Sequence, residues 1–233
     1  MRVLVSLALI ASGVVAVLAD AQRWSPACAG GFDELDCLLL QDHMYDFALP
    51  AEPWVPIGTS AHLMALNYAL LAVAMLGFAR ALVRAWWAWF LGAPFALSFV
   101  VLAVTTYRSA IAGRVVEPDG FGYDVALYTY ILPWPAALLL GSAVGGLPLR
   151  SSVVRGARAV AAPVLLALTS PFPLYFVASI AVFYASHDTS PWDVAVGGVL
   201  TALAGLALLT ARRHVPEPEW PRPRRPSAPL TIV

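Results

Sequence analysis

The chain has 233 residues, of which 60% are hydrophobic and 12% are charged, and its formal net charge is zero. A soluble domain carries about 25% charged residues, so this composition excludes an ordinary water-soluble protein. All fourteen cationic residues are arginines, and no basic segment is interleaved with aromatic residues, so we expect no nucleic-acid partner. The composition is typical of an integral membrane protein, in which a spanning helix needs about 20 mainly apolar residues.

Residues 3–18 form the first apolar run, and the tripeptide Ala19-Asp20-Ala21 follows it. The A-x-A pattern is compatible with a cleaved signal peptide, whereas the apolar run is compatible with a retained signal-anchor or first transmembrane helix over 1–19. We favour the retained helix. Under either interpretation, residues 20–60 form an extracytoplasmic loop.

The extracytoplasmic loop contains both cysteines of the chain, Cys28 and Cys37. Disulfides persist on the oxidising side of a membrane, and the two glycines that follow Cys28 allow the chain to double back. A thiol oxidoreductase would use a Cys-x-x-Cys pair, which this chain lacks. The spacing therefore predicts a structural disulfide.

Residues 36–49 of the same loop have the periodicity of a short amphipathic helix. Leu40 and Met44 fall on one face of such a helix, while Asp42 and Asp46 fall on the other side. This pattern predicts a helix that lies on the outer leaflet or packs over the ends of the membrane helices.

Five further apolar segments follow the loop, and arginines or polar turns separate them. They cover residues 61–79, 85–106, 125–147, 159–184 and 194–211. We predict an all-α, polytopic membrane helix bundle of about six spans, or five if the first is cleaved, with a five-helix bundle over 61–211. The arginine- and proline-rich tail, residues 212–233, is predicted to be disordered.

The arginines divide unevenly between the two sides of the predicted membrane. With the N-terminus in the cytoplasm, eleven of the fourteen arginines are cytoplasmic, and Arg23, Arg108 and Arg114 are outside. Cytoplasmic loops carry an excess of arginine and lysine. We therefore predict a multi-pass protein of a bacterial plasma membrane, with a cytoplasmic C-terminus and, if the first helix is retained, a cytoplasmic N-terminus.

Three histidines and several carboxylates are expected at the same outer level. His43 and Asp46 would share a helix face, His62 begins the second span, and His187 and Asp188 lie in the last outer loop. The candidates for acid–base catalysis are His43, Asp46, His187 and Asp188. The candidate metal ligands are His43, His62 and His187, but their spacing matches no metal signature. We therefore expect no cofactor, and we prefer a role in hydrogen bonds that tie the loops together.

The predicted spans contain small residues and prolines but no charged residue at their centres. Small residues allow close helix approach, either within one bundle, which we prefer, or in a homodimer. Proline in the third, fourth and fifth spans is compatible with broken helices around a substrate path. The small residues in question are Gly141, Gly145, Gly198, Ala202 and Gly205.

No transporter, protease or glycosyltransferase signature is present in the chain. The leading hypothesis is a non-enzymatic accessory or assembly subunit of the cell envelope, whose partners are the lipid bilayer and either other membrane subunits or a second copy. One alternative is a transporter or channel for a neutral or lipid-like substrate. The other is a membrane enzyme with an outward-facing His/Asp site.

Overall fold

The computed structural model describes residues 1–46, 53–82, 86–116, 154–155, 157–185 and 189–213. These parts are helical apart from one pair of two-residue strands. The predicted fourth span and the tail beyond residue 213 lie outside the described residues.

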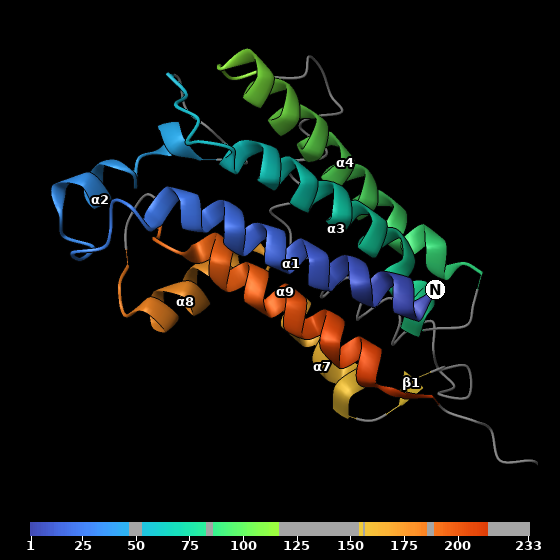
Figure 1. Ribbon diagram of the computed structural model, residues 1–233. Helices are drawn as coiled ribbons and strands as arrows, with labels where there is room; N and C mark the ends of the chain where they lie inside the picture. Colours follow the sequence, from blue (N-terminus) through green and yellow to red (C-terminus); the bar gives the residue numbers. More distant parts are fainter. Residues whose placement is uncertain (47–52, 83–85, 117–153, 156, 186–188, 214–233) are drawn as a thin grey trace, which may run out of the picture.

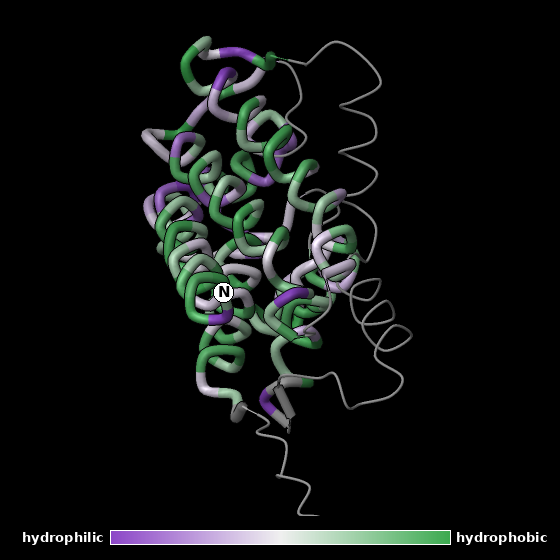
Figure 2. The backbone as a smooth tube through the Cα atoms, turned by 90° about the vertical axis from the view of Figure 1, so that its right-hand side faces the viewer, coloured by the Kyte–Doolittle hydropathy of each residue, from purple (hydrophilic) through white to green (hydrophobic). Residues whose placement is uncertain are grey.

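Four helices are long and apolar enough to cross a membrane (Figure 1), and Figure 2 shows hydrophobic residues along most of their length. They correspond to the first, second, third and sixth predicted spans, so the prediction of a helical protein suited to a membrane is confirmed. They are α1 (Arg2–Trp24), α3 (Ser60–Leu82), α4 (Ala88–Ala112) and α9 (Asp193–Thr210).

Helix α1 is longer than predicted and lies between α3 and α9. The sequence predicted a helix that stops at residue 19, but the helix continues to Trp24 and includes Asp20 and Arg23. It can continue because both charged side chains are bonded within the protein, as described below. The final turns of α1 are therefore part of the packed bundle.

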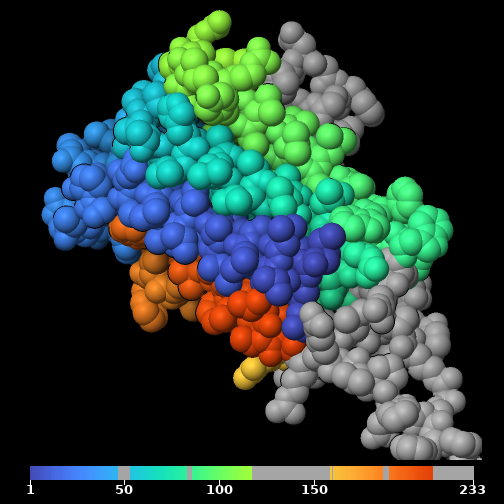
Figure 3. All heavy atoms as spheres, turned by 45° about the vertical axis from the view of Figure 1, so that its right-hand side comes forward, coloured from blue at the N-terminus to red at the C-terminus, as the bar shows by residue number. Residues whose placement is uncertain are grey.

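Helices α1 and α9 are antiparallel and in close contact, and they lie side by side in Figure 3. A Cβ atom on Gly13 would overlap the carbonyl oxygen of Gly198, and one on Gly205 would lie 2.7 Å from the carbonyl oxygen of Ser6. Gly198 and Gly205 thus serve packing within the bundle, as preferred from the sequence. Gly141 and Gly145 lie outside the described residues.

The two ends of α9 are bonded to charged residues at the two ends of α1. Asp20 accepts a hydrogen bond from the backbone nitrogen of Ala195 at 2.7 Å, in the first turn of α9. Arg2 Nη1 donates to the carbonyl oxygen of Ala211 at 2.6 Å, beyond the last turn. Each charge has the sign that stabilises the helix end it contacts.

The predicted fifth span is broken into α7 (Ala157–Ala167) and α8 (Pro171–Val182), whose axes differ by 89°. The first turn of a helix normally exposes unpaired N–H groups, but Pro171 and Pro173 have none. At the end of α7, the Thr169 hydroxyl donates to the carbonyl oxygen of Leu166 at 2.7 Å. The break thus leaves few unsatisfied backbone groups. The described chain has five candidate spans if this bent pair counts as one.

The segment between α1 and α3, which we call the cap (residues 25–46 and 53–59), extends beyond the end of α1 (Figure 1). The Cys28–Cys37 disulfide is present, as predicted. The single amphipathic helix predicted over 36–49 is wrong, because the chain forms α2 (Leu35–Leu39) and then a separate 3₁₀ turn, η1 (His43–Tyr45). The Asp42 side chain accepts from the backbone nitrogen of Met44 at 2.9 Å, and this local bond competes with a continuous helix.

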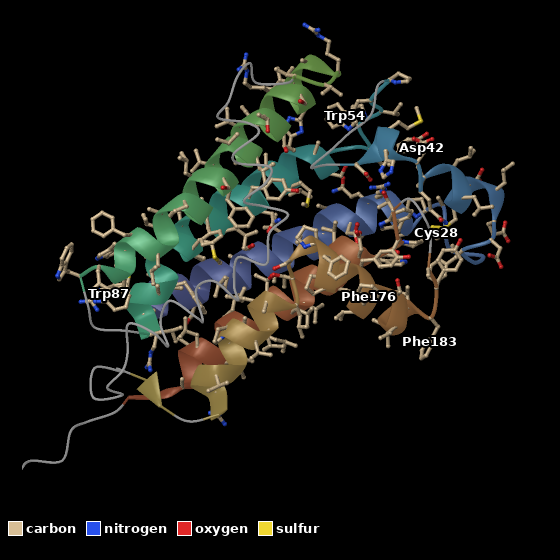
Figure 4. All side chains as sticks on the ribbon, turned by 180° about the vertical axis from the view of Figure 1, so that it is seen from behind. Cys28, Asp42, Trp54, Trp87, Phe176 and Phe183 are labelled. Atoms are coloured by element: carbon tan, nitrogen blue, oxygen red, sulfur yellow. A yellow bond between two sulfur atoms is a disulfide. The ribbon has the colours of Figure 1, made fainter. Side chains whose placement is uncertain are left out.

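The opposite end of the bundle, which we call the arginine end, contains a small antiparallel strand pair. Strand β1 (Val154–Arg155) pairs with β2 (Arg212–Arg213), close to the N-terminus of α1 (Figure 1). All seven acidic residues in the described parts of the chain lie in the cap or at the helix ends beside it. In Figure 4, Cys28 in the cap and Trp87 near the start of α4 lie at opposite ends of the bundle.

Candidate functional site

The described residues contain one network of buried charges, which we call the cap cluster. It lies where the last turns of α1 meet the cap and the start of α9. Asp20, Arg23 and Trp24 come from α1 and share one face because they are three or four residues apart. Asp46 comes from the cap, and Thr189 precedes α9.

Arg23 is the centre of the cap cluster, and it is only 2% exposed. Its Nη1 lies 3.0 Å from Asp46 Oδ1, and its Nε and Nη2 donate to the carbonyl oxygen of Leu40 at 3.2 and 2.6 Å. Its guanidinium carbon lies 4.4 Å from the centre of the Trp24 ring. A buried charge needs such partners, because removal from water is expensive unless it is compensated.

Asp46 connects three parts of the chain that are distant in sequence. One of its oxygens accepts from Arg23 on α1 and from the hydroxyl of Thr189, the latter at 2.7 Å. The other lies 2.7 Å from Nδ1 of His43 in the cap. The backbone nitrogen of Thr189 also donates to the carbonyl oxygen of Gln41 at 3.1 Å. The cap and the segment before α9 are therefore held together by polar bonds.

Asp20 is fully buried and acts as a cap for a helix other than its own. Its two oxygens accept from Trp24 Nε1 at 2.9 Å and from the backbone nitrogen of Ala195. The residue at the N-cap position of α9 is Trp192, in a left-handed conformation with φ 64°, and its side chain makes no capping bond. Asp20 supplies the acceptor that an N-cap side chain usually provides.

The structure brings His43 and Asp46 together, but it gives His62 a different neighbour. The His62 ring lies edge-on to Tyr107 of α4, with ring centroids 6.0 Å apart. His187 and Asp188 lie outside the described residues. Within the described ranges, no group of three or more His, Cys, Asp and Glu side chains is arranged to hold a metal ion. The catalytic and metal-binding sets therefore remain predictions.

Sequence reasoning missed Asp20, Arg23 and Thr189 as members of the cluster. The sequence does contain a pattern that could have indicated Asp20 and Arg23: the two residues are three positions apart and follow directly after an apolar run. Such charged residues at a helix end are costly in a membrane unless they are paired. Thr189 has no local signal, since its partner Asp46 is 143 residues away in the chain.

A second candidate site is a cavity of about 70 Å³ between the helices, in the half of the bundle nearer the cap, which we call the bend cavity. It lies between α1, α3, α4 and α9, next to the bend between α7 and α8. Its wall is mostly apolar and includes Phe99 and Leu174. The polar side chains that line it include Asn67, Thr169 and Thr201.

A groove between α1 and α9 has a different character. It has a volume of about 370 Å³ and an apolar wall that includes Val14, Leu18 and Leu203. The face that carries these two helices is seen in Figure 3. Such a surface is expected of helices that contact lipid chains.

No protein-family model matches the chain, and no curated protein or solved structure matches it. The class of the protein therefore rests on the helices themselves. It is a helical protein with four, or up to five, candidate membrane-spanning helices and a disulfide-linked cap.

Proposed function

We propose that the chain is a multi-pass protein of a bacterial plasma membrane, with the arginine end in the cytoplasm and the cap outside. The distribution of charge supports this orientation. Arg2, Arg158 and the strand pair β1–β2 belong to the arginine end, whereas the described acidic residues gather at the cap end. Membrane proteins retain arginine-rich loops in the cytoplasm.

Within this setting, the protein acts as a non-enzymatic accessory or assembly subunit whose cap binds another envelope protein. The observation that carries this proposal is a group of exposed leucines on α2. Leu35, Leu38 and Leu39 are 70%, 44% and 57% exposed. Large apolar side chains gathered on an exposed surface mark contacts with another protein or with a membrane, and we propose the former because the cap extends beyond the end of α1.

A disulfide and hydrogen bonds also constrain the part of the cap that carries α2. The Cys28–Cys37 disulfide closes the segment that carries α2, and Arg23 bonds to the carbonyl oxygen of Leu40 directly after it. Ordering a flexible loop on binding weakens affinity, so a rigid loop binds more tightly with the same contacts. The buried charges of the cap cluster therefore support binding indirectly, by positioning α2.

A paired substitution in α2 tests this proposal. The variant Leu35→Ser/Leu39→Ser should reach the membrane in wild-type amounts but lose a protein that co-purifies with the wild type in mild detergent. The control is Ile111→Ser at the end of α4, where the side chain is 65% exposed. Purification of the wild type alone, with or without cross-linking, would contradict the proposal.

The second candidate function is transport of a neutral or lipid-like substrate. The 89° break between α7 and α8 and the bend cavity beside it favour this function, because broken helices form the binding sites of many transporters. Solute flux in proteoliposomes tests it. Equal flux with and without the protein counts against transport of the solute that is measured.

An enzyme with an outward-facing site has weaker support. His43 is 54% exposed at its side chain and contacts Asp46, as an acid–base pair would. However, Asp46 also binds Arg23 and Thr189, which favours a structural role for this carboxylate. We therefore rank enzymatic activity third.

A further inference from the structure

We infer that the bend cavity is a binding site for a neutral hydroxyl group. This inference goes beyond partner binding by the cap, because it concerns a separate site between the helices, and it deepens the second candidate function, which uses the same cavity. It rests on three observations: the hydrogen-bonding groups that line the cavity, the size of the cavity, and the lack of charged side chains among its described lining residues.

Asn67 provides a hydrogen-bond donor. The side chain lines the cavity, and the residue is only 6% exposed. Its carbonyl oxygen accepts from the hydroxyl of Ser12 at 2.6 Å, which fixes the orientation of the amide. Among the hydrogen bonds between described residues, none is made by the amide nitrogen. Because the side chain lines the cavity, this nitrogen can donate to an occupant that offers an acceptor.

Two threonines provide the complementary acceptors. The hydroxyl of Thr201 donates to the carbonyl oxygen of Gly197 at 2.8 Å, and that of Thr169 donates to the carbonyl oxygen of Leu166. Because a hydroxyl has a single proton, each oxygen is left with lone pairs that can only accept. An occupant that accepts from Asn67 and donates to a threonine satisfies both kinds of group, and a hydroxyl does both.

The lining described for the cavity disfavours an ion. None of its described lining residues is Asp, Glu, Lys, Arg or His. An ion that enters an apolar environment without a counter-charge is strongly destabilised. A neutral alcohol does not have this cost.

The size of the cavity limits the part of a ligand that fits inside. A cavity of about 150 Å³ can hold a benzene molecule, so the bend cavity, at about 70 Å³, has room for about three non-hydrogen atoms. That volume fits a short alcohol, or the hydroxyl end of a longer alcohol whose chain extends into the bilayer. Both sources share the same chemistry.

Ligand-observed NMR on the full-length protein in phosphatidylcholine nanodiscs distinguishes the two sources. One arm uses n-propanol in the water phase, and the other uses isotope-labelled hexadecanol in the bilayer. We expect saturable transfer of magnetisation from the protein to at least one probe. The probe that binds identifies the source.

Matched variants test whether the binding is at this cavity. Thr201→Val keeps the shape of the side chain but removes the acceptor, so it should weaken binding by about fivefold. The control is Thr105→Val, because the hydroxyl of Thr105 on α4 also bonds to its own helix but does not line the cavity. The double variant Ser12→Ala/Asn67→Leu removes both side chains of the Ser12–Asn67 hydrogen bond, including the donor that faces the cavity, and should abolish binding.

Two results would overturn the inference. One is the absence of saturable binding of both alcohols to folded wild-type protein, which would leave water as the occupant. The other is binding that is unchanged in both Thr201→Val and Ser12→Ala/Asn67→Leu. Neither result affects the proposed role of α2, because the experiment uses the isolated protein.

Discussion

The charged residues of the cap cluster make bonds that satisfy one another inside the protein. Arg23 neutralises Asp46 and binds a backbone carbonyl, while Asp20 caps α9 and accepts from Trp24. Each interaction joins α1 to another segment or fixes the end of α1 itself. At the scale of single residues, the cluster has the properties of a structural joint between the cap and the bundle.

The substitution Arg23→Ala should lower the free energy of unfolding by about 3 kcal/mol, because it leaves a partly buried carboxylate without its partner. Thermal unfolding of the purified protein in detergent measures this effect. Arg114→Ala is the control, because Arg114 is exposed and its loss should change stability by less than about 0.5 kcal/mol. An Arg23→Ala protein that unfolds at the wild-type temperature would show that the ion pair does not hold the cap.

Asp20 offers a comparison between charge and hydrogen bonding. Asp20→Ala removes the acceptor for the backbone nitrogen of Ala195 and should lower the free energy of unfolding by about 1–2 kcal/mol. Asp20→Asn retains an acceptor oxygen and should lose less. The same unfolding experiment measures both. Equal losses for the two variants would indicate that the negative charge, not the cap bond, matters.

At the scale of elements, the pairing of α1 with α9 organises the bundle. Glycines allow the two helices to approach closely, and charged residues bond the two ends of α9. Helix α1 also contacts α3 through the bond between Ser12 and Asn67. An N-terminal helix with this many partners is a central element of the described fold.

A larger side chain at Gly205 should separate α1 from α9. Gly205→Leu would place atoms against the backbone of Ser6, and such overpacking destabilises proteins by about 1–3 kcal/mol. The control is Val199→Leu on the same helix, where the side chain is 50% exposed. Unfolding temperatures and the yield of folded protein report the difference. Equal stability of both variants would argue against close packing at Gly205.

The central position of α1 also leads to a prediction about processing. Cleavage after Ala21 would remove Asp20 and the glycine contact with α9, so we expect residues 2–21 to be present in the folded protein. The intact mass of protein purified from membranes measures this directly. A mass that lacks these residues would support the signal-peptide interpretation instead.

At the scale of the whole molecule, hydropathy predicted the features that depend on local composition. The apolar runs located four of the long helices, and the cysteine spacing predicted the Cys28–Cys37 disulfide. Both predictions depend on residues that are close together in the sequence. The described acidic residues gather at the cap end, as the assignment of the outer loops predicted, whereas the orientation in the membrane stays a prediction.

Other features depend on contacts that a local pattern does not contain. The pattern of residues 36–49 predicted a helix, but it did not account for the bond from Asp42 to the backbone of Met44. The bond between Asp46 and Thr189 joins the cap to the segment before α9, and these two residues are 143 positions apart in the sequence. The end of α1 was placed too early because its charged residues are paired only in the folded protein.

The central claim is that the cap lies outside the membrane and binds another envelope protein through α2. Photo-cross-linking in living cells tests it directly, with a photoreactive amino acid at Leu39 and, as the control, at Ile111, both of which are exposed. We predict that Leu39 forms a covalent adduct with one other polypeptide and that Ile111 does not. Adducts with lipid alone at Leu39, or the same protein adduct at both positions, would contradict the claim.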